Sequence, residues 1–240
     1  MSFPLFEEQV GTESDWVKKL CSEFGHNEGF YKRLSKNIEE MYNDNGYAKS
    51  DSVYPRNKND IFRAFQLTSF KKTRVVIMGE APYPSSAAHG LSFSVKPKTN
   101  IYPPTLCNIF MELRLDTGCD KPSTTCLKKW AERGVLLLNT RLTCGIKGLN
   151  WKRFIDAVIK VINDKGSVVF MLWGTKAVEK KSLITNTSNK VICSSHPSPM
   201  SAYEGFITED GEEVAKFFES RPFSQASNFL GCSNEELWRL

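Results

Sequence analysis

Four short apolar runs constrain the fold of this 240-residue chain more than any other feature. In each run, apolar side chains occupy successive positions, which is typical of strands buried on both faces of a parallel sheet. Segments with helical periodicity separate the runs. This alternation predicts a three-layer α/β/α fold around a central, mainly parallel four-stranded sheet. We expect strands over residues 74–79, 134–139, 167–173 and 190–193, and helices over 106–115, 127–133, 151–162 and 175–183.

The remaining sequence predicts no second domain. Residues 1–52 are expected to be mainly helical, because Trp16, Leu20 and Phe24 recur at helical spacing. No linker, repeat or low-complexity tract interrupts the chain, so we expect residues 1–240 to form one domain. Residues 207–220 resemble an acidic insertion, with five carboxylate side chains against one lysine. We expect a solvent-exposed helix there, and the alternative is a docking element for a protein partner.

Composition argues against several classes of protein. The seven cysteines show no C-x-x-C spacing and the three histidines no i, i+4 spacing, so we expect no disulfide framework, no metal and no cofactor. No apolar run approaches the roughly 20 residues of a membrane span, and the first residues do not resemble a signal peptide. We therefore expect a soluble, intracellular monomer, in cytoplasm or nucleus. A net charge of +5 permits an anionic partner without requiring one.

Each predicted strand is followed by a loop rich in glycine, proline and polar residues. These loops include residues 79–84, 139–141, 174–175 and 196–201. In open α/β sheets ligands bind beyond the carboxyl ends of the strands, so the four loops predict one binding crevice. The glycine motifs of dinucleotide and P-loop enzymes are absent, and Ser198 lacks the G-x-S-x-G context of a hydrolase nucleophile.

Several segments stand in a characteristic order. They are Val-Tyr-Pro at 53–55, Ala-His-Gly-Leu-Ser-Phe-Ser-Val at 88–95, Pro-Pro-Thr-Leu at 103–106, Leu-Leu-Leu-Asn-Thr at 136–140, Leu-Trp-Gly at 172–174 and His-Pro-Ser-Pro-Met-Ser-Ala-Tyr at 196–203. Over residues 53–228 this set resembles the family-1 uracil-DNA glycosylases. The resemblance implies a base excision repair enzyme that flips deoxyuridine out of single- or double-stranded DNA and hydrolyses its N-glycosidic bond.

The resemblance also implies a role for each residue of the crevice. Asn139 would read the uracil edge with its amide, and Phe93 would stack on the flipped base. Tyr83 would exclude the methyl group of thymine. His196 would donate a hydrogen bond to uracil O2, where negative charge develops. The residues that would contact DNA are the wedge Met200 together with Thr105, Gly174, Thr175, Ser198, Ser201 and Tyr203.

The first motif of the chain departs from the family pattern. It reads Gly-Glu-Ala-Pro-Tyr-Pro at 79–84, where the family usually has Gly-Gln-Asp-Pro-Tyr-His. Ala81, in the substrate-binding set, replaces the aspartate that positions the attacking water, and alanine cannot do this. Glu80 supplies a carboxylate one position earlier. Gly-Glu-Ala-Pro is similar to the first motif of family-4 glycosylases, but those carry an iron–sulfur cluster that this cysteine pattern does not support.

Two functions therefore remain open. The first is a metal-independent uracil-DNA glycosylase in which Glu80 positions water and His196 stabilises the uracil anion; the retained crevice residues favour it. The second is a weakly active or inactive homologue that acts as a DNA-binding, replication-associated or protein-interaction factor. Ala81, the acidic insertion and Glu204 favour it, since Glu204 stands where the family usually has arginine and would repel phosphates. Activity on another modified base is disfavoured by Tyr83.

Overall fold

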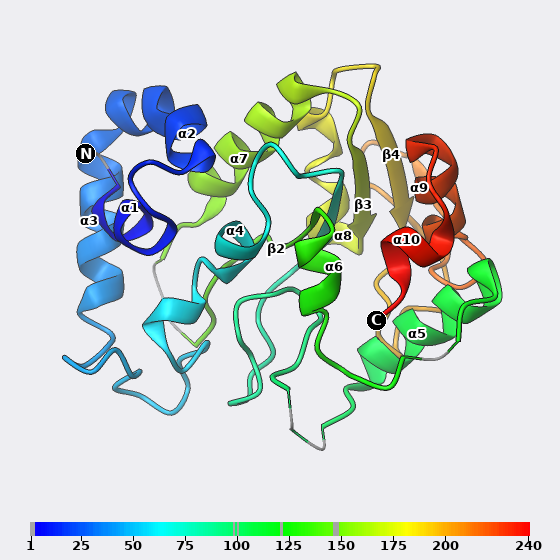
Figure 1. Ribbon diagram of the computed structural model, residues 1–240, viewed down its shortest axis with the longest axis horizontal. Coiled ribbons are helices and arrows are strands. Elements are labelled where there is room, and N and C mark those ends of the chain that lie inside the picture. The colour runs from blue at the N-terminus through cyan, green and yellow to red at the C-terminus, as the bar shows by residue number, and fades with distance from the viewer. Residues whose placement is uncertain (1–2, 98, 100, 121, 146–148) are drawn as a thin grey trace.

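A computed structural model describes residues 3–97, 99, 101–120, 122–145 and 149–240 (Figure 1). Its centre is a four-stranded sheet in which every pairing is parallel, in the order β2-β1-β3-β4. The strands are β1 (Val75–Gly79), β2 (Val135–Asn139), β3 (Val169–Trp173) and β4 (Lys190–Ser194). Every residue of β1, β2 and β3 is buried, which explains their continuous apolar sequences. The predicted three-layer α/β/α fold is confirmed, and the sheet is parallel throughout.

Helices cover the sheet close to where periodicity predicts them. The N-terminal helices α1, α2 and α3 lie at one end of the molecule, and α9 and α10 lie at the other, beside β4 (Figure 1). The prediction for 175–183 is correct in place but not in form, because α8 ends early and a separate 3₁₀ turn, η2, follows. The bounds are α1 (Pro4–Val10), α2 (Asp15–His26), α3 (Glu28–Glu39), η1 (Lys58–Asp60), α4 (Arg63–Leu67), α5 (Pro104–Thr117), α6 (Lys128–Glu132), α7 (Lys152–Lys165), α8 (Thr175–Val178), η2 (Lys181–Leu183), α9 (Pro222–Leu230) and α10 (Asn234–Trp238).

An aromatic cluster attaches the N-terminal helices to the rest of the protein. The rings of Phe3 and Phe6 lie 5.3 Å and 5.2 Å, centroid to centroid, from Phe154 of α7. Phe6 also contacts Phe62 and Phe65 edge-on at 5.1 Å and 5.3 Å. All five rings are buried, so this end gains both apolar burial and favourable edge-to-face geometry.

The described helices include none that is long and apolar enough to cross a membrane.

Residues 207–220 do not form the expected surface helix. Instead β5 (Phe206–Ile207) pairs antiparallel with β6 (Glu213–Val214) to make a short hairpin. Asp210-Gly211 closes it, with Gly211 at φ 84°, and the Glu212 amide donates to the Thr208 hydroxyl at 2.8 Å. Asp-Gly is strong hairpin chemistry, and it outweighs the helical propensity of the surrounding glutamates. Beyond the hairpin the chain returns inward, where Phe217 packs on Trp173 at 5.2 Å.

Candidate active site

The loops that follow the strands gather at one edge of the sheet. All four strands are parallel, so their carboxyl ends lie on the same side, near the start of α5 (Figure 1). Gly79, the last residue of β1, is the register partner of Asn139, the last residue of β2. Trp173 and Ser194 end β3 and β4 as register partners in the same way. The predicted crevice residues therefore leave the sheet side by side.

The side chains of Asn139 and Phe93 come together above Gly79, and we call the place where they and the His196 ring gather the slot. A Cβ atom at this position would stand 2.7 Å from Asn139 Oδ1 and 3.0 Å from Phe93 Cζ, closer than van der Waals contact allows. Asn139 and Phe93 are only 5% and 8% exposed. Among the described residues no hydrogen bond involves the Asn139 side-chain amide, and its atoms are not among the buried unpartnered groups, so they keep some access to solvent. The amide is thus available to a ligand.

Phe93 is held in an unusual backbone conformation. Its φ of 61° is in the left-handed region, which is unfavourable for a residue with a bulky side chain. Two hydrogen bonds fix it there: Tyr83 Oη donates to the Phe93 carbonyl at 3.2 Å, and the Ser92 amide donates to the Leu137 carbonyl at 3.1 Å. The ring also packs on Trp173 at 5.4 Å. Such strain persists only where the surroundings hold it, which is typical of functional sites. Burial raises the pKa of Tyr83, which keeps this hydroxyl protonated as a donor.

His196 lies beside Phe93 in the slot. Its ring lies 5.8 Å from Phe93, centroid to centroid. The Ser198 amide donates to His196 Nδ1 at 3.1 Å, so in the neutral ring Nε2 carries the proton and can donate. Burial lowers the pKa of His196, and the negative charge of Glu80 partly opposes this effect. A Cβ on Gly174 would stand 2.9 Å from His196 Cβ, so glycine is required there for the ring to approach.

Glu80 lies beside the slot. One carboxylate oxygen of Glu80 accepts a hydrogen bond from Arg141 Nη2 at 2.8 Å, and the two side chains are 52% and 55% exposed. The Arg141 amide and the Thr140 hydroxyl donate to the Glu80 carbonyl at 3.0 Å and 2.9 Å. Glu80, Arg141 and Lys176 line a separate hollow of about 540 Å³. The Glu80 carboxylate is therefore directed to Arg141 and to this separate hollow.

Most of the residues expected to contact DNA lie around His196. A hollow of about 220 Å³ is lined by Gly174, Thr175, Met200, Ser201 and also by Glu204. Met200 is 95% exposed at its rim, as a wedge residue must be. Ser198 Oγ donates to Ser201 Oγ at 3.4 Å.

Three residues of the predicted DNA-contacting set do not line this hollow: Ser198, Thr105 and Tyr203. Thr105 is in the first turn of α5, which is tied to the His196 loop because Asn108 Nδ2 donates to the Pro197 carbonyl at 2.9 Å. Tyr203 is exposed, and its ring packs on Phe218 at 4.8 Å instead of lining the hollow.

Two residues near the site were missed by sequence reasoning. Ser92 fastens the Phe93 loop, because its side chain donates to the Ile77 carbonyl at 3.3 Å. Arg141 pairs with Glu80. A signal existed for Arg141, since it follows the strand next to the one that Glu80 follows, and opposite charges after neighbouring parallel strands end up close together.

The slot brings together the amide of Asn139, the imidazole of His196 and the aromatic ring of Phe93. In the described part of the chain, no three His, Cys, Asp or Glu side chains come together as a possible metal site. Asn139 offers a donor and an acceptor along one edge of its amide. Fold and site thus define an α/β protein in which an amide, an aromatic ring and an imidazole gather where its parallel strands end.

Comparisons with known proteins identify the family. The family model described as the uracil DNA glycosylase superfamily matches residues 65–230. Proteins named uracil-DNA glycosylase from Clostridium beijerinckii and Alkaliphilus oremlandii are each 42% identical over 232 residues, covering 93% of this chain and 94% of theirs. The crystal structure of mimivirus uracil-DNA glycosylase superposes with a TM-score of 0.74 at 22% identity, covering 89% of this chain and 83% of that chain. The chain belongs to the uracil-DNA glycosylase superfamily.

Proposed function

We propose that this protein hydrolyses the N-glycosidic bond of deoxyuridine flipped out of DNA. The observation that carries the proposal is the slot, where the unpartnered Asn139 amide and the Phe93 ring both lie close above Gly79. Uracil presents a carbonyl oxygen and an N–H side by side, which match the donor and the acceptor of one amide. Tyr83, held by its bond to the Phe93 carbonyl, would lie against uracil C5 and exclude a methyl group.

His196 supplies the electrostatic stabilisation in this proposal. As the glycosidic bond breaks, the leaving base gains negative charge on O2, and a fixed donor there lowers the barrier. The bond from the Ser198 amide to Nδ1 leaves Nε2–H free to donate. The lowered pKa of His196 favours the neutral ring, which donates from Nε2 without bringing a positive charge of its own. We assign the chain to family 1 because of the His196 loop and the Phe93 segment. Glu80 is the feature that resembles family 4.

We propose that Glu80 supplies the catalytic carboxylate after its ion pair with Arg141 breaks and its side chain rotates. Ala81 stands where the family usually has aspartate and carries no group that orients water. Glu80 is half-exposed and its ion pair with Arg141 is at the surface, where such pairs contribute little stability, so rotation of Glu80 toward the sugar is inexpensive. A DNA phosphate that binds Arg141 would favour this rotation. The substrate would thus be uracil-containing DNA, acted on inside the cell by a monomer.

The same geometry favours a second function. Ala81 carries no carboxylate, and the carboxylate of Glu80 is held by Arg141 and lines a separate hollow. A protein with this geometry would bind a flipped base without cleaving it and would act as a DNA-binding or interaction factor.

A single-turnover assay on uracil-containing single- and double-stranded DNA separates the two functions. The first function predicts abasic sites with the wild-type protein, and a loss of about 100-fold or more in Glu80→Gln. Ala81→Asp restores a carboxylate at the family's usual position and serves as the matched gain-of-function variant. No release by the wild type, together with release by Ala81→Asp, would establish the second function. Glu179→Gln, a surface carboxylate paired with Lys176, controls for loss of charge.

A further inference from the structure

The outer edge of β4 is open over two residues. The Lys190 amide donates to Val168 and the Ser194 carbonyl accepts from Gly174, so the even-numbered residues of β4 face β3. Val191 and Cys193 therefore direct their N–H and C=O groups away from the sheet. Within the described residues, no backbone hydrogen bond reaches these groups. An unpaired strand edge of this kind is a template for another strand.

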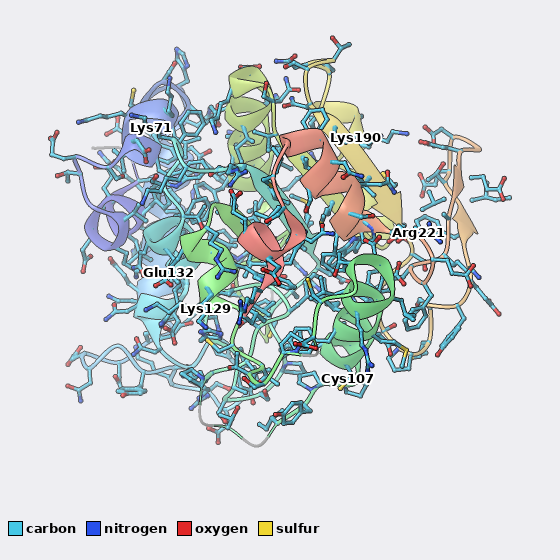
Figure 2. All side chains as sticks on the ribbon, turned by 45° about the vertical axis from the view of Figure 1, so that its right-hand side comes forward. Lys71, Cys107, Lys129, Glu132, Lys190 and Arg221 are labelled. Atoms are coloured by element: carbon cyan, nitrogen blue, oxygen red, sulfur yellow. The ribbon has the colours of Figure 1, made fainter. Side chains whose placement is uncertain are left out.

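This edge already accepts a chain segment at its carboxyl end. The Ser195 amide, directed outward like that of Cys193, donates to the Ala215 carbonyl at 2.8 Å. Ala215 follows β6, so the hairpin extends from the place where edge pairing stops. Figure 2 shows the hairpin at the right-hand edge of the molecule, beside β4, with Lys190 labelled at the start of that strand. The edge is thus flanked by the hairpin, whose Glu212 lies with Lys181 near the Cys193 side chain, while the outward backbone groups of Val191 and Cys193 stay without a hydrogen bond among the described residues.

A groove of about 580 Å³ lies beside this edge, between η2 and the hairpin. We call it the edge groove. Its apolar lining comes from Val178, Ile184 and Val191, and Ile207 is 73% exposed on the hairpin next to it. Ion pairing between Lys181 of η2 and Glu212 of the hairpin joins its two walls. The groove therefore combines an apolar surface, backbone hydrogen-bonding groups and a charged rim.

The rim charge identifies the occupant. Four carboxylates line the groove (Glu179, Glu209, Asp210 and Glu212) against the single cation Lys181. Among described residues Glu209 has no ion pair, and Glu179 is paired only with Lys176. DNA phosphates would be repelled from this rim, whereas lysine or arginine side chains would be attracted. A strand with alternating apolar and basic residues would satisfy the edge, the apolar lining and the rim together.

We propose that the edge groove binds an extended basic segment of a partner protein, which adds as a strand to β4 with apolar side chains against Val178, Ile184 and Val191. Thr175 lines both this groove and the hollow beside His196. A partner bound here would lie next to the candidate active site without entering the slot. Uracil excision is not needed for this interaction, so the proposal holds for either function of the slot.

Binding of a labelled synthetic peptide to the full-length protein tests the proposal. The probe is Lys-Val-Lys-Val-Lys-Val-Lys with blocked ends, followed by fluorescence anisotropy. We expect saturable binding, and binding about tenfold weaker for the Glu-Val counterpart of the same length. In the double variant Glu209→Lys/Asp210→Lys this preference should reverse. Glu213→Lys changes a neighbouring exposed carboxylate that does not line the groove, and should bind like the wild type.

Hydrogen exchange decides whether the probe pairs with β4. Bound peptide should slow exchange of the Val191 and Cys193 amides, while the Ser195 amide, already bonded to Ala215, should change little. Two further peptides carry N-methyl groups on alternate backbone nitrogens, one on the odd-numbered residues and one on the even-numbered residues. Only one set of N–H groups faces β4, so only one of the two peptides should lose binding. The absence of saturable binding by the basic peptide, equal loss in Glu213→Lys, or unchanged exchange at Val191 and Cys193 would each overturn the proposal.

Discussion

Glu80 Oε1 lies 2.8 Å from Arg141 Nη2, and this ion pair sits beside His196 instead of inside the slot. The two side chains follow the neighbouring parallel strands β1 and β2. The pair sets the charge that His196 experiences, because the negative charge of Glu80 raises the pKa of His196 while burial lowers it. Arg141 partly neutralises that charge.

The first prediction concerns the pKa of His196. Glu80→Gln should lower it further, since only burial then acts, and Arg141→Met should raise it, since Glu80 is then unneutralised. Titration of the His196 ring by NMR measures both shifts, with Glu179→Gln as the control. Identical pKa values in Glu80→Gln and wild type would contradict the proximity of the two groups.

The second prediction concerns the floor of the slot. Gly79→Ala should abolish base binding, because the new Cβ would stand 2.7 Å from Asn139 Oδ1 and 3.0 Å from Phe93 Cζ. We expect single-turnover uracil excision to fall by about 100-fold or more. Gly25→Ala is the matched control: it lies on α2 with open space around it and should leave activity unchanged while stabilising the helix by about 0.5–1 kcal/mol. Full activity in Gly79→Ala would place the base elsewhere.

The third prediction concerns base selectivity. Asn139→Asp removes the amide donor, so a uracil carbonyl would face a carboxylate, and we expect uracil excision to fall by about 10- to 100-fold. Selectivity for uracil over cytosine should narrow as well, as measured on matched oligonucleotides. Asn150→Asp, an exposed asparagine in the hollow that Glu80 lines, controls for added charge. Unaltered selectivity in Asn139→Asp would show that another group reads the base.

The fourth prediction concerns acid stability. His89 is buried, and burial together with Arg63 and Lys96 lowers its pKa to about 3 from an ordinary 6.5. As the pH falls below about 6.5, His89 therefore binds a proton in the unfolded chain but stays neutral in the folded protein. The stability is fully present above that pH and falls as the pH drops toward 3, by about 2 kcal/mol between pH 7 and 5.

Urea unfolding of wild type and His89→Asn at pH 7 and pH 5 checks the fourth prediction. The variant should lose this part of the pH dependence even if it is less stable overall, because the comparison is made within each protein. His26→Asn, at an exposed helix end, should behave like the wild type. An equal decrease in the stability of wild type and His89→Asn would assign the effect to other groups.

Local patterns were sufficient to predict the sheet. Continuous apolar runs identified its strands to within one or two residues, because strands buried on both faces, as β1, β2 and β3 are, need such sequences; β4, at the edge, is only partly buried. The same reasoning placed Gly79 and Asn139 at one edge, since parallel strands end together. It was wrong for residues 207–220, where Asp210-Gly211 fixes a hairpin and the glutamates suggested a helix.

The sequence by itself determined the strands, the polar loops that follow them and the family. These features depend on the types of residue and on their order along the chain. Only the tertiary structure decided where Glu80 points. Its carboxylate pairs with Arg141, and no composition or motif encodes that direction. The edge groove also arises only in three dimensions, because the segments after β4 and after the hairpin are joined by the backbone bond between Ser195 and Ala215.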